Sequence, residues 1–231
     1  MASDPKADPI PSVWARPTPT PAPARPALSR TLIVSEAVLM LDAEGVEAVS
    51  MRKLGARLNA GATSLYRHVA LKSELMELAV DKVLGEVTPP PADHPDWREA
   101  LTEFAGSFRA TALRHPWLCT LLGQEGLAYL GPNLSSMNER LFALFSTAGL
   151  PDPSSAINAI YSYCIGMIST ESAWLNTVAR SGQTEVEFLT RLHPDTSTTV
   201  SDASDAAAIR DDSFTSGLNI VLDGLAFQLS R

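Results

Sequence analysis

The chain contains little cysteine, few aromatic residues and no long apolar run. It has two cysteines, Cys119 and Cys164, among 231 residues, and neither has the spacing of a metal or redox site. No stretch reaches the roughly 18 consecutive apolar residues that a membrane-spanning helix needs. The first residues lack the basic start and apolar run of a signal peptide. We therefore expect a cytoplasmic protein with no membrane partner, no metal and no cofactor.

Signatures of catalysis are missing as well. We find no phosphate-binding loop, zinc spacing or nucleophile elbow. His115 and Cys119 could be imagined as a nucleophilic pair, but Pro116 lies between them and would align them poorly. Because Cys119 and Cys164 stand among apolar neighbours, we interpret both as core thiols. The sequence predicts no enzyme and no catalytic residues, and a Cys/His enzyme is kept as an alternative.

The charge that is present is unevenly distributed. The chain has a net charge of -8, and residues 88–231 hold sixteen acidic against eight basic side chains. In contrast, Ser50–Lys72 contains five Lys or Arg and no acidic residue. A basic window in an acidic chain indicates a surface that meets an anion.

The basic window also has the pattern of two short helices. Ser50 is a good N-cap residue, and apolar residues follow it at helical intervals up to Leu58. Asn59–Gly61 then predicts a tight turn, because Asn and Gly tolerate a left-handed backbone. A second helix is expected over Ala62–Val69, with polar and basic residues facing outward. The pattern is typical of a helix-turn-helix whose second helix enters a DNA major groove.

The remaining patterns predict an all-α protein. We expect residues 1–27, rich in Pro and Ala, to form a disordered arm. Further helices are predicted over 30–44, 71–87, 96–115, 132–148, 154–178 and 211–229, and 179–212 is expected to be a mobile polar loop apart from a short segment at 185–192. Thr88–Pro91 ends the fourth helix. The predicted domains are therefore the arm 1–27, a DNA-binding domain 28–87 and a helical ligand-binding and dimerisation domain 92–231.

The order of residues resembles the N-terminal domain of the tetracycline-repressor (TetR) family. The resemblance lies in the runs GVEAVSMRKL (Gly45–Leu54), SLYRHV (Ser64–Val69) and KSEL (Lys72–Leu75). It implies a three-helix DNA-binding domain, a homodimer joined by a four-helix interface, and a small-molecule effector of unknown identity that releases a repressor from a palindromic double-stranded DNA operator. A helical small-molecule-binding or adaptor protein with a degenerate helix-turn-helix is the other alternative.

The resemblance and the side-chain chemistry together assign candidate site residues. Candidates for base contacts are Arg52, Thr63, Ser64 and Arg67, and candidates for phosphate contacts are Tyr66, His68 and Lys72. Candidate ligand-binding residues are Phe108, Trp117, Met137, Phe145, Tyr161, Met167, Glu171 and Trp174. Candidate dimer-interface residues are Ile165, Leu218, Leu222 and Leu225, with internal core packing as the alternative.

Overall fold

The computed structural model describes residues 28–125, 131–192 and 203–229, and every regular element in these ranges is a helix. The predicted arm 1–27 and the polar run 193–202 lie outside the described residues. The N-terminal helices are α1 (Arg30–Glu44), η2 (Val46–Ala48), α2 (Met51–Arg57), α3 (Ala62–Leu65) and α4 (Lys72–Leu84). The others are α5 (Trp97–Arg114), α6 (Leu118–Glu125), α7 (Pro132–Thr147), α8 (Pro153–Ser181), α9 (Glu185–Leu192) and α10 (Ala203–Leu229).

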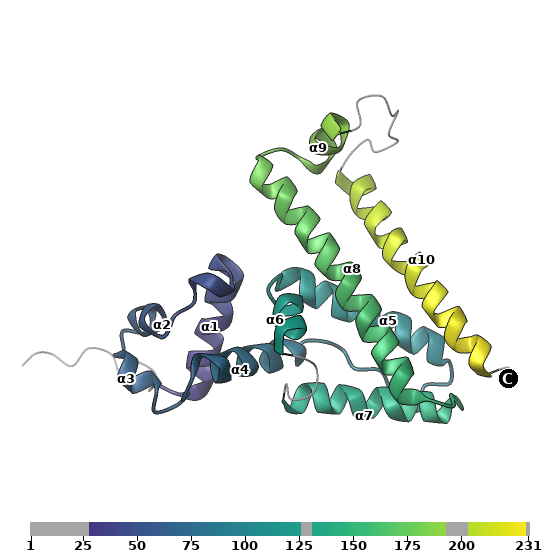
Figure 1. The fold of residues 1–231 in the computed structure, drawn as a ribbon, viewed down its shortest axis with the longest axis horizontal. Helices are drawn as coiled ribbons and strands as arrows, with labels where there is room; N and C mark the ends of the chain where they lie inside the picture. Colours follow the sequence, from purple (N-terminus) through teal and green to yellow (C-terminus); the bar gives the residue numbers. More distant parts are fainter. Residues whose placement is uncertain (1–27, 126–130, 193–202, 230–231) are drawn as a thin grey trace, which may run out of the picture.

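Helices α1 to α4 form a small unit at one end of the molecule, which we call the head (Figure 1). The Ser29 hydroxyl accepts a hydrogen bond from Leu32 N–H and so caps α1, which ends at Gly45 with φ +78°. Ile33, Leu54 and Leu75 each have 0% of their surface exposed and fill the centre of the head. The hydrophobic effect of burying these large side chains holds the short helices α2 and α3, which would not be stable alone.

Helices α5 to α10 form the larger part, which we call the body (Figure 1). Two long helices, α8 and α10, run side by side toward α9, while α5 and α7 pack against α8. The rings of Phe104 and Phe108 each meet Tyr161 edge-on, at centroid distances of 6.2 and 6.3 Å. These residues join α5 to α8 in the body core.

Helix α4 belongs to both parts. It packs against α1 in the head and against α6 and α7 in the body. Its buried residues Leu75 and Val83 are members of one continuous apolar core that reaches from the head into the body. The two parts are therefore joined by packing as well as by the chain.

Three expectations about the helices need correction. The helix expected over Ala62–Val69 ends at Leu65 and continues as a turn. Helix α6 was not predicted. The last helix begins at Ala203 instead of Asp211, because its first turns pack against α8 and α9 and do not belong to a loop. No described helix has the length and hydropathy to span a bilayer.

Candidate functional sites

The turn between α2 and α3 has tightly specified geometry. Asn59 has φ +51°, the left-handed conformation, while Gly61 at φ -67° does not need its glycine freedom. Ala60 N–H donates to Gly55 O at 2.8 Å and Asn59 N–H donates to Ala56 O at 3.1 Å, which is a Schellman ending of α2. A Cβ on Gly55 would lie 2.7 Å from Ala60 O and 3.1 Å from Leu65 Cδ1. Only glycine lets α3 approach α2 this closely.

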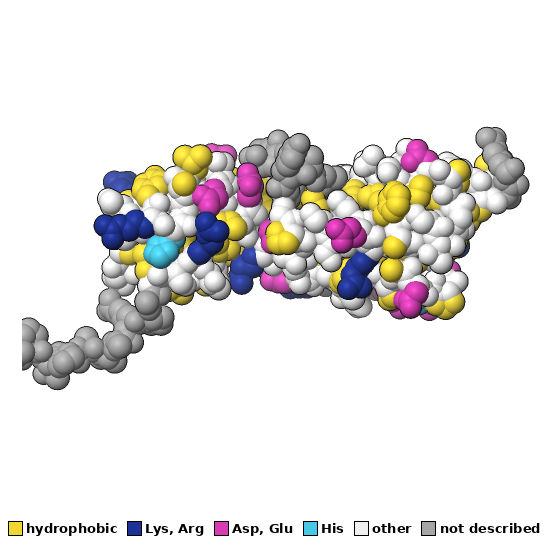
Figure 2. All heavy atoms as spheres, turned by 90° about the horizontal axis from the view of Figure 1, so that it is seen from below, with side chains coloured by type: hydrophobic (Ala, Val, Ile, Leu, Met, Phe, Trp, Pro, Cys, Tyr) yellow, Lys and Arg dark blue, Asp and Glu magenta, His cyan; other side chains and the backbone are white. Residues whose placement is uncertain are grey.

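The candidate DNA-contacting residues surround this turn. Arg52, Thr63, Tyr66, Arg67 and Lys72 are exposed. Ser64 and His68 are partly exposed. In Figure 2, Lys and Arg side chains gather at the head end with a His beside them. The fold thus brings residues from α2, α3, the following turn and the start of α4 together at one end of the molecule.

The basic side chains of the head divide into two groups. Arg57 pairs with Glu36 at 2.6 Å, Lys53 pairs with Glu44 at 3.3 Å, and Arg30 also pairs with an acidic residue of the head. Arg52, Arg67 and Lys72, by contrast, form no ion pair among the described residues. The sequence alone could not distinguish the five Lys and Arg side chains of Ser50–Lys72 from one another. In the structure, three of them carry a charge that no nearby carboxylate neutralises.

A polar cluster ties the head to the body, and we call it the junction. Asp42 Oδ1, on α1, accepts a hydrogen bond from Trp117 Nε1 at 2.6 Å and lies 2.7 Å from His115 Nδ1. The other ring nitrogen of His115 lies 3.3 Å from Glu86 Oε2, which also accepts from Arg114 at 3.1 Å. Burial acts to raise the pKa of Glu86, but the hydrogen bonds from Arg114 and His115 outweigh it and lower that pKa.

The junction also bears on two sequence predictions. Trp117, a candidate ligand contact, is buried and is instead a hydrogen-bond donor to Asp42. His115 does not pair with Cys119, because both of its ring nitrogens face carboxylates. Burial raises the pKa of Cys119 to about 11 and that of Cys164 to about 12, as expected for core thiols.

A second contact between head and body lies on α4. Asp81 Oδ1 accepts from Asn133 N–H at 2.8 Å, and Asn133 Nδ2 donates to Asp81 Oδ2 at 3.0 Å and to the Asp81 carbonyl at 2.9 Å. These bonds fix the start of α7 against α4. A movement of α7 would therefore displace α4 and with it the head.

The body contains a cavity of about 360 Å³ near its far end, between α8, α9 and α10. Its walls are mostly apolar, with a few charged and hydroxyl side chains, which is the composition of many small-molecule sites. The lining residues are Met167, Thr170, Glu171, Trp174, Glu185, Leu189, Ala206, Ile209, Arg210, Ser213 and Phe214.

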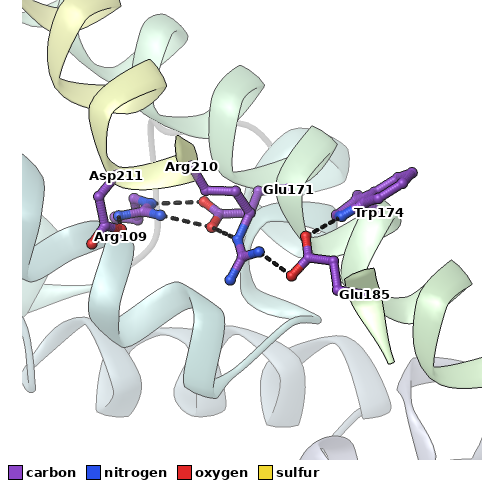
Figure 3. A network of polar contacts seen from close by, with 6 residues as sticks. All are labelled: Arg109, Glu171, Trp174, Glu185, Arg210 and Asp211. Carbon is purple, nitrogen blue, oxygen red and sulfur yellow. Dashed lines mark hydrogen bonds and ion pairs between the residues drawn. The ribbon is translucent and has the colours of Figure 1, made fainter. Parts of the chain in front are cut away.

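An ion-pair network forms one side of this cavity (Figure 3). Arg109, on α5, donates to both carboxylate oxygens of Glu171 at 2.7 Å and to Asp211 at 2.7 Å. Arg210, on α10, donates to Glu171 at 3.1 Å and to Glu185, which also accepts from Trp174 Nε1. The paired carboxylate raises the pKa of the Arg109 guanidinium against the opposing effect of burial. The network connects α5, α8, α9 and α10.

The structure separates the candidate ligand contacts into two sets. Met167, Glu171 and Trp174 line the cavity. Phe108, Met137, Phe145 and Tyr161 lie in the core of the body and do not line it. The placement differs from that of the other candidates because an aromatic or Met at helical spacing indicates burial without saying what it is buried against. The charged lining residues Glu185 and Arg210 were among those missed by the candidate list. Arg210 comes from the stretch interpreted as a polar loop, and Glu185 begins the short segment at 185–192 that was set apart from it.

Three of the four candidate interface residues point into the body. Leu218, Leu222 and Leu225 have 1%, 0% and 6% of their surface exposed within one chain, so they fill the body core. Their burial favours the alternative of internal packing. Ile165 is only partly buried. The outer face of α10 carries Ile220, which is 74% exposed.

A helix-turn-helix head on a helical body is an arrangement that this chain shares with known regulators. Residues 89–229 match the family model of the tetracyclin repressor-like C-terminal domain. An HTH-type transcriptional regulator of Saccharopolyspora erythraea is 41% identical over 71% of this chain and 69% of its own length. The chain belongs to the tetracycline-repressor family. The match places it among transcriptional regulators and confirms the resemblance seen at the N-terminus.

Other TetR-family relatives extend the likeness. The HTH-type transcriptional repressor DrrR1 of Streptomyces coeruleorubidus is 37% identical over 71% of this chain and 61% of its own length. Apo ActR from Streptomyces coelicolor superposes with a TM-score of 0.72 at 29% identity, covering 90% of this chain and 99% of ActR. ActR in complex with actinorhodin gives a TM-score of 0.71 at 28% identity, covering 89% and 100%. The all-α fold with a helix-turn-helix head is that of this TetR family.

Proposed function

We propose that this chain is a ligand-responsive repressor that binds a palindromic operator as a homodimer and leaves it when a small molecule binds the body. Residues 28–87 serve as the DNA-binding domain, and residues 92–231 bind the ligand and the second subunit. The observation that carries the proposal is the set of three exposed bases, Arg52, Arg67 and Lys72, that have no ion-pair partner in the described chain and surround the α2–α3 turn.

DNA contact follows from the chemistry of this surface. Arg67 and Arg52 can each donate two hydrogen bonds to a guanine edge, while Thr63 and Ser64 offer hydroxyl groups to either base type. Lys72, Tyr66 and His68 are assigned to phosphates, which set the register of the head on the duplex. An unpaired guanidinium exchanges water for a base edge without first breaking an ion pair. A head in which all five Lys and Arg side chains of Ser50–Lys72 were neutralised would bind DNA more weakly.

Two heads are needed for a palindrome, and the outer faces of α8 and α10 supply the interface. Ile220 is exposed on α10, and Ser162, Gly166 and Ser169 are exposed on α8, where small side chains allow close approach of another helix. Pairing these faces covers the apolar side chain and places the heads on two half-sites about one helical turn apart, roughly 34 Å.

The effector site is the cavity between α8, α9 and α10. ActR has been solved with actinorhodin bound, which supports a small-molecule ligand here, and DrrR1 is named a repressor, which supports repression. A ligand in the cavity contacts α8 and α10, the two helices of the proposed interface, and reaches α5 through Glu171 and Arg109. α5 ends at the junction. Differential binding to two arrangements of the dimer needs about 1–3 kcal/mol of coupling to change operator affinity roughly 5- to 150-fold.

The test of DNA binding compares two arginines of the same head. An operator is first selected from random duplexes with the wild-type protein, and affinity is then measured by fluorescence anisotropy. Arg67→Ala should lose on the order of 1–3 kcal/mol of operator affinity, because it removes a direct base contact. Arg57→Ala is the matched control, since the Arg57 guanidinium is already held by Glu36 and Glu44.

The result of this comparison decides the assignment. The Arg57 variant should lose folding stability more than operator affinity. Equal losses of affinity in the two variants would show that general head charge, and not the exposed reading surface, binds the duplex. Failure to select any preferred duplex would reject the repressor proposal as a whole.

A further inference from the structure

The charged groups in the wall of the cavity between α8, α9 and α10 are bonded to one another, and one hydrogen-bond donor is left over. Glu171 accepts three bonds from Arg109 and Arg210, and Glu185 accepts from Arg210 and Trp174. Arg210 uses Nε and Nη1 in these bonds, and its Nη2 makes no hydrogen bond or ion pair with another described residue. None of the contacts drawn in Figure 3 involves this nitrogen. Each guanidinium nitrogen of this kind carries N–H groups and cannot accept.

The leftover donor is held in a fixed position. The carboxylates of Glu171 on α8 and Glu185 on α9 form ion pairs with the planar guanidinium of Arg210. These pairs fix the direction of Nη2 relative to the cavity wall. The Trp174 ring is likewise oriented by its N–H bond to Glu185 and by an edge-on contact with Phe188 at 5.4 Å. A ligand therefore meets a preformed site, which lowers the ordering cost of binding.

The charge of the site is balanced before a ligand arrives. Arg109 and Arg210 face Glu171 and Glu185, whose side chains are only 9% and 12% exposed, while Asp211 is 65% exposed and largely hydrated. A ligand anion would lie close to two buried carboxylates. A ligand cation would lie close to the guanidinium groups of Arg109 and Arg210, so neither charged class suits the cavity.

We propose that the cavity takes an uncharged, largely apolar ring compound whose carbonyl oxygen accepts a hydrogen bond from Arg210 Nη2. Its rings lie against Met167, Leu189 and Ile209 and against the face of Trp174. This inference rests on the proposed role of the cavity as the effector site and adds the chemical class of the effector.

A matched pair of probes tests the carbonyl directly. Isothermal titration calorimetry is carried out on the full-length protein with 2-hydroxy-9-fluorenone and with 2-hydroxyfluorene, which lacks only the carbonyl. The ketone should bind roughly tenfold more tightly, equivalent to about 1.4 kcal/mol. The anionic analogue 9-fluorenone-2-carboxylate should bind no more tightly than the hydroxy ketone.

Variants then identify the donor. In Arg210→Met combined with Glu185→Gln, which avoids leaving Glu185 as an unpaired buried carboxylate, the ratio of the affinity for 2-hydroxy-9-fluorenone to that for 2-hydroxyfluorene should fall to near one. Arg180→Met removes an exposed arginine of α8 that does not line the cavity, and it should keep the wild-type ratio. The ratio is used because a general loss of stability weakens both probes alike.

Two outcomes overturn the proposal in different ways. Equal affinity of the two probes for the wild type, or an unchanged ratio in the double variant, rejects the carbonyl contact and leaves the cavity as an effector site. If neither probe binds the wild type, the proposed class of ring ligand is rejected for this cavity. Selection of an operator is independent of both results, so failure of the repressor proposal would be recognised separately.

Discussion

Replacing Gly55 by Ala should destabilise the protein, although the same change in most helices does the opposite. In an unobstructed helix, Gly→Ala stabilises by about 0.5–1 kcal/mol because alanine loses less backbone entropy on folding. At Gly55 the new Cβ would lie 2.7 Å from the Ala60 carbonyl oxygen, which is backbone and cannot rotate away. Overpacking of this kind costs about 1–3 kcal/mol, so the free energy of unfolding should fall by about 1–2 kcal/mol.

Gly106→Ala is the matched control for this change. Gly106 lies in the middle of α5 and is exposed, and a Cβ added there would meet no neighbouring element within 4 Å. Urea unfolding followed by far-UV circular dichroism should therefore show opposite signs for the two variants. Gly55→Ala should also lose at least about tenfold in operator affinity, because opening the turn moves α3 and displaces a base contact. Equal stabilisation by both substitutions would refute the argument that this close approach sets the geometry of the head.

Three further predictions concern the body and the junction. Ile220→Glu should give monomers in analytical ultracentrifugation and leave stability normal, whereas Leu222→Glu should unfold the chain, because only Leu222 is buried within it. A dimeric Ile220 variant would contradict the proposed interface. Asp42→Asn should lower the free energy of unfolding by about 1–2 kcal/mol, because the junction loses a charged hydrogen-bond acceptor. The same change should reduce the effect of an effector on operator affinity. An unchanged effect of the effector would exclude the junction from signal transfer. Cys119 and Cys164, with pKa values raised to about 11 and 12, stay protonated at pH 8 and should react with a disulfide reagent only after unfolding; rapid labelling of the native protein would contradict their burial.

Most helix boundaries could be predicted because local chemistry determines them. Ser50 accepts a hydrogen bond from an amide of the first turn of α2, as its residue type predicts. Asp96 does the same for α5, and Gly45 ends α1. The start of α10 could not be predicted in this way. Its first turns have few large apolar residues, and they are held by contacts such as those of Arg210 with Glu171 and Glu185, which are distant in sequence.

The faces of the long helices were predictable only in part. The spacing of Leu218, Leu222 and Leu225 correctly indicated a buried stripe on α10, but periodicity does not say whether the partner is the same chain or a second one. The exposure of the candidate DNA-contacting residues was easier to predict, because the outward face of a short helix follows from the same helical pattern. Some basic side chains are neutralised by a carboxylate, as Arg57 is by Glu36. Which ones are neutralised depends on how α1 packs on α2, and only the structure shows this packing.

The sharing of α4 between the head and the body limits how the head can move. A flexible linker would allow a continuous range of head angles, but Leu75 and Val83 belong to one close-packed core, and Asp81 is bonded to α7. Close-packed side chains interlock in a few discrete arrangements instead of deforming gradually. The distance between two heads should therefore take one of a small number of values. Each dimer then either fits its operator or does not. A partial dose of effector should change how many dimers fit the operator, and not how well each dimer fits.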